Sequence, residues 1–196
     1  MNIDLLLFER ILNSDEKALD ELINKYRNPL TLFINGFVKD IDVAESLMID
    51  VFVELVCKKN KFRGESSLKT YLFAIGRNKA LKYIKKNKNY DFIPLEEVGY
   101  CITTEQTIED EIAQVLRRET VHKALNELNP TYREILYLLF FEDMSYEQAA
   151  QVLHKNKKQV SNLAFRAKQA LKKILTEWEC LDENNWRNQK RSVKKI

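Results

Sequence analysis

The fold of this chain is decided by the stretch SYEQAAQVLHKNKKQVSNLAFRAKQALKK, residues 145–173. Apolar residues recur in it at steps of three and four, which is the spacing of one helix face. Ser145 and Asn156 each precede such a run, and both belong to the residue types that cap helix N-termini. Only residues 154–156 separate the two runs. The stretch therefore predicts a helix-turn-helix.

The second helix of this pair has one apolar and one polar face. Its buried stripe is predicted to be Val160, Ala164, Ala167 and Leu171, at steps of four, three and four. The opposite face carries side chains that can hydrogen-bond base edges or phosphates in a major groove: Lys157, Lys158, Ser161, Asn162, Arg166 and Gln169. We predict a DNA-reading helix. The alternative is a helix pair that serves only as a packing unit.

The rest of the chain is also predicted to be helical. Four glycines and three prolines among 196 residues provide few of the turns that a sandwich or barrel needs. Asn129 and Pro130 open a predicted helix over residues 131–142. Asp42 and Glu45 form a pair like a capping box and predict the start of another helix. The expected fold class is all-α, with two small helical domains joined by a linker.

Charge is unevenly distributed, although the formal net charge is only +3. Residues 58–90 contain eleven basic residues and one acid, and residues 154–173 contain seven basic residues and no acid. Both blocks include aromatic residues that could stack on bases: Phe62, Tyr71, Phe73, Tyr83 and Phe165. One basic block alone is most often a solvated helix face. Two such blocks with aromatic residues favour nucleic acid as the partner.

An acidic segment separates the two basic blocks. Residues 91–111 contain seven acids, no lysine or arginine, a proline and a glycine. We expect a helical domain over 1–90, an acidic linker over 91–111, a helix-turn-helix domain over 112–176 and a tail over 177–196. The linker is either a solvated tether or a mimic of nucleic acid. The tail is either disordered or packed on the second domain through its two tryptophans.

The helix expected after Asp42 is apolar on two faces. One face would form the core of the domain: Ala44, Leu47, Met48, Val51, Phe52 and Leu55. The other face shows Ile49 and Val53 beside Ser46 and Asp50. A partner protein would bury that second face. The alternative is that two exposed aliphatic residues have no special role.

Several function classes lack the residues that they need. Cys57, Cys101 and Cys180 are far apart and form no C-x-x-C pair, so neither a disulfide framework nor a cysteine zinc site is indicated. No segment resembles an export signal or a membrane span, and we expect a cytoplasmic protein. No catalytic constellation, phosphate loop or metal-ligand spacing stands out. We therefore expect neither enzyme activity nor a metal or cofactor.

The run from Ala124 to Leu175 resembles region 4, the promoter-recognition domain, of bacterial RNA polymerase sigma factors of the extracytoplasmic-function type. The matching positions are the leucine-rich start, Arg133, the step 147–150, Val160 and the closing 165–167. The run departs from the family pattern at His154, Lys155 and Leu163. The resemblance implies that the helix-turn-helix reads the minus-35 element and that Arg133 joins the DNA-binding residues. Base preference does not transfer.

Residues 42–86 resemble region 2 of the same family. The matching elements are residues 44–45, 51–52, the turn 62–64, Tyr71 with Leu72, Ile75 and residues 77–78. Region 2 implies a surface that docks on the polymerase clamp helices: Ser46, Ile49, Asp50 and Val53. It also implies a segment that separates the strands of the minus-10 element and holds an unstacked base: Lys61, Phe62, Arg63, Tyr71, Phe73, Arg77, Asn78 and Lys82. Tyr71 and Phe73 could equally be core residues.

The resemblance implies a promoter-specificity subunit without catalytic residues. Its partners would be core RNA polymerase, through the clamp helices and flap, promoter DNA and, as a candidate, an anti-sigma factor. The acidic linker would enter the polymerase cleft. The competing hypothesis is a stand-alone helix-turn-helix regulator that binds duplex DNA without polymerase, often as a dimer on a palindrome.

Overall fold

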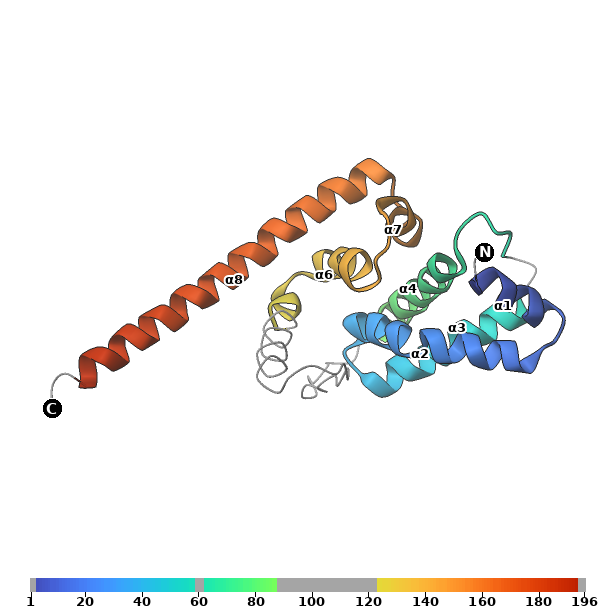
Figure 1. The fold of residues 1–196 in the computed structure, drawn as a ribbon, viewed down its shortest axis with the longest axis horizontal. Coiled ribbons are helices and arrows are strands. Elements are labelled where there is room, and N and C mark those ends of the chain that lie inside the picture. The colour runs from blue at the N-terminus through green and yellow to red at the C-terminus, as the bar shows by residue number, and fades with distance from the viewer. Residues whose placement is uncertain (1–2, 59–61, 88–122, 194–196) are drawn as a thin grey trace. The chain divides into compact units, whose positions relative to one another are not determined.

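The computed structural model describes residues 3–58, 62–87 and 123–193, with side chains described up to residue 178. Within these ranges the regular elements are all helical and no strand occurs, which confirms the expected all-α class. In chain order the elements are α1 Ile3–Leu12, α2 Glu16–Val38, α3 Ile41–Cys57, α4 Leu68–Asn87, α6 Pro130–Leu136, the π-helix η2 Tyr137–Phe141, α7 Tyr146–Leu153 and α8 Lys157–Val193. Figure 1 labels all of them except η2.

The described residues divide into two compact units. Among the described residues, the first contains 3–58, 62–87 and 137–161, and the second contains 123–136 and 162–193. The division into domains over 1–90 and 112–176 stays a prediction. The linker expected over 91–111 lies outside the described residues. Helix α8 extends to Val193, so most of the segment expected as a separate tail continues this helix.

Helices α2, α3 and α4 pack on one another and form the core of the first unit. Apolar residues three or four positions apart give each helix one buried face. The largest of the fully buried side chains are Leu22, Leu30, Ile34, Val51, Leu55, Leu68, Leu72 and Phe73. Gly76 lies where α4 packs on α2, and a Cβ at this position would lie 3.4 Å from Cδ1 of Ile34, in ordinary van der Waals contact.

A buried carboxylate fastens α1 to α2. Asp4 is 9% exposed and accepts a hydrogen bond from the hydroxyl of Tyr26 at 2.6 Å. Burial and this hydrogen bond to Asp4 raise the pKa of Tyr26, so the phenol keeps the proton that it donates. Leu7, Phe8 and Ile11 bury the same face of α1. Helix α1 is thus an integral part of the first unit.

Helix α3 is capped by Asp40. Its Oδ1 accepts hydrogen bonds from the backbone N–H groups of Asp42 at 3.0 Å and Val43 at 3.1 Å. The predicted capping pair of Asp42 and Glu45 is therefore wrong by two residues. Asp42 lies inside the first turn, where a carboxylate interacts favourably with the positive end of the helix dipole. Oε1 of Glu45 lies 3.6 Å from Nη2 of Arg27.

Replacement of Asp40 tests this cap. Asp40→Ala is expected to lower the free energy of unfolding by about 1 kcal/mol, because two N–H groups lose their acceptor. Asp42→Ala removes a carboxylate from the same turn and is the matched control. In buffer with enough salt to screen the helix dipole, it should change stability little. Urea unfolding followed by circular dichroism measures both, and equal losses in the two variants would contradict the assignment.

Both predicted caps of the helix-turn-helix are confirmed. Ser145 Oγ accepts the N–H of Gln148 at 3.2 Å, and Gln148 Oε1 accepts the N–H of Ser145 at 2.8 Å. Asn156 and Gln159 form the same reciprocal pair, at 2.8 Å and 3.0 Å. Each pair satisfies N–H groups that the first turn of a helix leaves without partners. The two helices therefore start at fixed residues.

His154 ends α7 in the left-handed conformation, with φ 52° and ψ 45°. Glycine adopts this conformation without the steric cost that a Cβ imposes. We expect His154→Gly to raise the free energy of unfolding by about 0.5–1 kcal/mol and His154→Ala to lower it. Thermal denaturation of the two variants measures the difference. A lower melting temperature for His154→Gly than for the wild type would contradict this expectation.

The helix predicted over 131–142 is divided in two. It starts at Pro130, with Asn129 Oδ1 accepting the N–H of Tyr132 at 2.9 Å as expected, but the α-helix ends at Leu136 and the π-helix η2 follows. Glu142 follows η2 and is 7% exposed, with Lys69 Nζ 2.9 Å from its Oε2. Burial raises the pKa of Glu142, and the ion pair with Lys69 opposes this rise.

Candidate functional site

The first turns of α8 present the predicted DNA-reading residues to solvent. Val160, Ala164 and Ala167 of the predicted stripe are buried, whereas its fourth member, Leu171, is half-buried. The exposed residues include all six predicted members of the reading face: Lys157, Lys158, Ser161, Asn162, Arg166 and Gln169. Lys157 forms an ion pair with Glu147 of α7, and this hydrogen-bonded lysine lowers the pKa of Glu147. The polar face is therefore available to a ligand, with its first lysine tied to α7.

Phe165 lies in the centre of this polar face. Its side chain is 65% exposed, and helix geometry places it opposite the buried stripe. From the sequence, Phe165 is predicted to be able to stack on bases but is not among the predicted site residues. Its position around the helix axis could have assigned it, because Phe165 lies on the same side of α8 as Asn162 and Gln169. Leu163, one of the positions that departs from the family pattern, is half-buried.

Arg133 points toward the backbone of its own unit. Its guanidinium donates hydrogen bonds to the carbonyl oxygens of Leu125 at 2.9 Å, Asn126 at 2.6 Å and Leu128 at 3.2 Å. Burial lowers the pKa of Arg133. The side chain therefore holds the turn before α6. Its predicted contact with DNA stays a prediction, and the structure adds this internal role.

An aromatic cluster supports the loop before α4. The ring of Phe62 lies 5.0 Å from that of Phe8 in an edge contact and 5.1 Å from that of Tyr71. Phe62 and Tyr71 are half-buried, so each keeps part of its ring in solvent. Arg63 is exposed beside them. Lys61, predicted for the same site, lies outside the described residues.

Phe73 requires a correction. The resemblance to region 2 implies that it is a DNA-binding candidate, but its side chain is fully buried and its ring lies 5.1 Å from that of Phe33. A base could reach it only if the core opened. The remaining candidates of α4 keep access to solvent, since Arg77 is half-buried and Asn78 and Lys82 are exposed.

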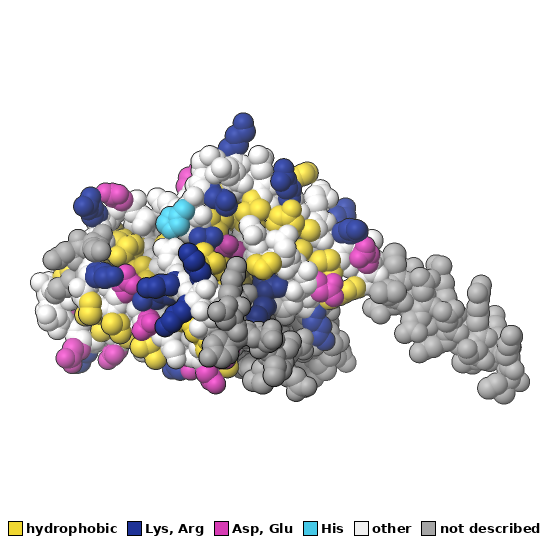
Figure 2. Space-filling view, turned by 180° about the vertical axis from the view of Figure 1, so that it is seen from behind, with side chains coloured by type: hydrophobic (Ala, Val, Ile, Leu, Met, Phe, Trp, Pro, Cys, Tyr) yellow, Lys and Arg dark blue, Asp and Glu magenta, His cyan; other side chains and the backbone are white. Residues whose placement is uncertain are grey.

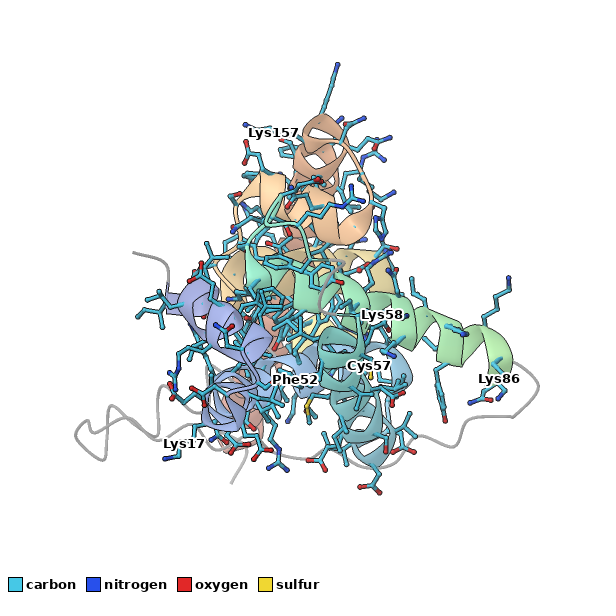
Figure 3. The ribbon with its side chains drawn as sticks, turned by 90° about the vertical axis from the view of Figure 1, so that its right-hand side faces the viewer. Lys17, Phe52, Cys57, Lys58, Lys86 and Lys157 are labelled. Carbon is cyan, nitrogen blue, oxygen red and sulfur yellow. The ribbon has the colours of Figure 1, made fainter. Side chains whose placement is uncertain are left out.

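Basic side chains are numerous on the described surface, and many stand out among uncharged and hydrophobic ones in Figure 2. In α4 they extend to the last turn, where Lys86 lies at the C-terminal end of the helix (Figure 3). Lys58 follows Cys57 at the end of α3 in the same view. The basic block predicted from residue 58 onward therefore starts directly after α3 and continues along α4.

Glu54 of α3 pairs with two members of this basic block. Its Oε1 lies 2.7 Å from Nζ of Lys58, and its Oε2 lies 3.1 Å from Nζ of Lys79 on α4. The hydrogen bond from Lys58 has the largest effect and lowers the pKa of Glu54. The hydrogen bond from Lys79 lowers this pKa further, whereas partial burial opposes the change. This arrangement is not predictable from the sequence, because Glu54 and Lys79 are distant in sequence.

The outward face of α3 is apolar at its centre. Ile49 is 57% exposed and Val53 is 51% exposed, and Val56 continues the same face one turn later. Ser46 and Asp50 are exposed on this side, and Ser46 donates its hydroxyl hydrogen to the carbonyl oxygen of Asp42. The four predicted contact residues therefore share one accessible surface. Val56 is an additional member that the sequence analysis did not name.

Two kinds of feature are absent from the described part of the chain. None of its helices is both long and apolar enough to cross a membrane. Within the same residues, no three His, Cys, Asp or Glu side chains are grouped as metal ligands would be.

Comparison with known proteins accounts for both helical parts. Residues 22–90 match the family model described as Sigma-70 region 2, and residues 118–171 match the one described as Sigma-70, region 4. The chain is 29% identical over 181 residues to the RNA polymerase sigma-H factor of Pseudomonas aeruginosa, covering 88% of this chain and 93% of that protein. It is 26% identical over 157 residues to the ECF RNA polymerase sigma factor SigM of Bacillus subtilis, covering 80% and 94%.

A solved structure has a similar fold. It is the sigma factor RpoE in complex with the anti-sigma factor NepR from Bartonella quintana, with a TM-score of 0.64, 23% identity, and coverage of 82% of this chain and 98% of that chain. Both sigma-70 regions occur in order, and each matches a part of the chain that has an exposed candidate interface. The chain therefore belongs to the sigma-70 family and is an RNA polymerase sigma factor of the extracytoplasmic-function type.

Proposed function

We propose that this sigma factor binds core RNA polymerase through the outward face of α3, separates promoter strands with α4 and the loop before it, and reads the minus-35 element with α8. The observation that carries the proposal is that the chain has two exposed surfaces of different character, an apolar face on α3 and a polar, basic face on α8. Ile49 and Val53 suit a protein partner, whereas Asn162 and Arg166 suit base edges and phosphates. A factor that joins polymerase to DNA needs both.

The strand-separating surface consists of Phe62, Arg63, Tyr71, Arg77, Asn78 and Lys82, with Lys61 retained as a sequence prediction. Aromatic rings that keep one side in solvent can stack on an unpaired base, and arginine and lysine side chains can hold its phosphates. Phe62 and Tyr71 contact each other, which supports an action of the two rings as one platform. Phe73 is left out because it is fully buried.

The reading helix offers two kinds of base contact. Asn162, Arg166 and Gln169 can form hydrogen bonds in the major groove. Phe165 adds an exposed apolar ring among them, and the apolar group that a major groove presents is the thymine methyl. A thymine facing Phe165 is the base preference that this surface supports. Arg133 would assist by fixing the turn before α6.

The site of action and the regulation follow from this role. A factor that works with RNA polymerase works in the bacterial cytoplasm, and it contributes binding energy rather than catalytic groups. The RpoE structure contains the anti-sigma factor NepR. An anti-sigma factor that covers the outward face of α3 would prevent polymerase binding here, and such a partner is part of the proposal.

Reconstituted transcription tests the proposed function. Core RNA polymerase with this protein should start RNA at a defined set of promoters, and core enzyme alone should not. The competing hypothesis, a stand-alone regulator, predicts specific binding to duplex DNA without polymerase and no effect of the protein on promoter choice by core enzyme. Failure to bind core enzyme would overturn the sigma-factor mechanism proposed here.

A further inference from the structure

Glu54 forms ion pairs with two lysines of the basic block, one at the end of α3 and one on α4. Each carboxylate oxygen of Glu54 is used by one lysine, Lys58 at 2.7 Å and Lys79 at 3.1 Å. The Glu54 side chain is 28% exposed, so these pairs lie near the surface rather than in the core. Two lysines of the basic block are therefore paired with one acid that lies outside the block in sequence, and its single negative charge offsets one of their two positive charges.

Glu54 is close enough to the aromatic platform to influence it. Burial raises the pKa of Tyr71, the charge of Glu54 raises it further, and the charge of Lys58 lowers it. A phosphate that reached this part of the surface would meet Lys58, whose side chain is 47% exposed, beside the less exposed carboxylate of Glu54. It would compete with that carboxylate for the N–H donors of Lys58 and Lys79.

The competition has a clear energetic consequence. Phosphate contacts by lysines provide affinity for any DNA, regardless of sequence. An internal carboxylate that holds two lysines reduces this general affinity, whereas base stacking on Phe62 and Tyr71 is unaffected. Discrimination between properly placed single strands and other DNA therefore increases.

We propose that Glu54 acts as an internal competitor for DNA phosphates, holding Lys58 and Lys79 so that sequence-independent binding of DNA by the free protein is weakened. This inference rests on the proposed function for its purpose, but the competition itself is a property of the isolated chain. Glu54 is a positioning residue here, since it acts through the two lysines.

The salt dependence of DNA binding by the free, full-length chain tests the inference. The probe is a fluorescein-labelled single-stranded oligodeoxynucleotide of mixed sequence, with anisotropy measured over a series of salt concentrations. Glu54→Gln should tighten binding about three- to tenfold at low salt and steepen the slope of log affinity against log salt by up to about 1.4, because each released lysine adds about 0.7.

Glu45→Gln is the matched control. Glu45 lies on the same helix, and its carboxylate lies 3.6 Å from Arg27 rather than from the basic block. The control loses the same single negative charge, so it should change the salt slope little. Equal affinities and slopes for Glu54→Gln and Glu45→Gln would overturn the inference.

A second variant separates competition from a change in folding. In Glu54→Gln/Lys58→Gln, much of the added slope should disappear, because one of the released lysines is gone. A double variant that keeps the full increase contradicts the mechanism. Circular dichroism melts of each variant identify any loss of fold.

Transcription separates this inference from the proposed function. Glu54→Gln holoenzyme should lose more initiation than wild-type holoenzyme when unrelated competitor DNA is added. If neither protein starts RNA with core enzyme, the proposed function fails, while the oligonucleotide experiment still decides whether Glu54 competes with phosphates.

Discussion

Introducing aspartate at both Ile49 and Val53 is expected to weaken binding to core RNA polymerase about a hundredfold. These side chains form the exposed apolar centre of α3. Two carboxylates in their place would be buried without partners in the complex, and burying an unpaired charge is strongly unfavourable. Fluorescence anisotropy of labelled protein titrated with purified core enzyme measures the change.

Ile3→Asp is the matched control for this experiment. Ile3 is 67% exposed, compared with 57% for Ile49, and it lies on α1 outside the proposed interface. The control therefore adds a carboxylate to an equally accessible isoleucine. It should bind core enzyme as the wild type does. Unchanged binding of the α3 variant, or an equal loss in the control, would remove the outward face of α3 from the mechanism.

Local signals made the helix-turn-helix predictable. A cap and its partner are three residues apart, as in Ser145 with Gln148 and Asn156 with Gln159. The αL conformation of His154 also follows from a short turn between two capped helices. The cap of α3 was assigned incorrectly because Asp40 and Asp42 are both suitable residues, and only the backbone conformation of Asp40 distinguishes them.

Long-range features could not be obtained in this way. Glu54 and Lys79 belong to different helices, so only the packing of α3 on α4 brings them to 3.1 Å. Counting charges along the chain therefore overestimated the positive charge available to DNA. The π-helix η2 is similarly invisible in the sequence, because the same apolar spacing suits a continuous α-helix.

Phe73 and Tyr71 illustrate the limit most directly. Both are aromatic residues in the same two turns of α4, and apolar spacing allowed either to face the core. The structure separates them, since Phe73 is fully buried against Phe33 whereas Tyr71 is half-buried beside Phe62. Phe73 therefore stabilises the fold, whereas Tyr71 is part of the proposed contact with a base.

Substitution of each residue by alanine should therefore have opposite signatures. Phe73→Ala is expected to lower the free energy of unfolding by about 3–5 kcal/mol, because it removes a buried ring and leaves a cavity. Tyr71→Ala should cost much less stability but should impair promoter opening. Urea unfolding of the full chain measures the first effect, and permanganate reactivity of promoter thymines in the holoenzyme measures the second.

The two measurements can also contradict the roles assigned to Phe73 and Tyr71. A Phe73→Ala protein of nearly normal stability that fails to open promoters would return Phe73 to the DNA-binding surface and would mean that the core between α2 and α4 is not closed around it. Tyr71→Phe keeps the ring and removes only the hydroxyl, so it should open promoters normally if stacking is the role of Tyr71. Loss of opening in Tyr71→Phe would instead assign the function to the hydroxyl group.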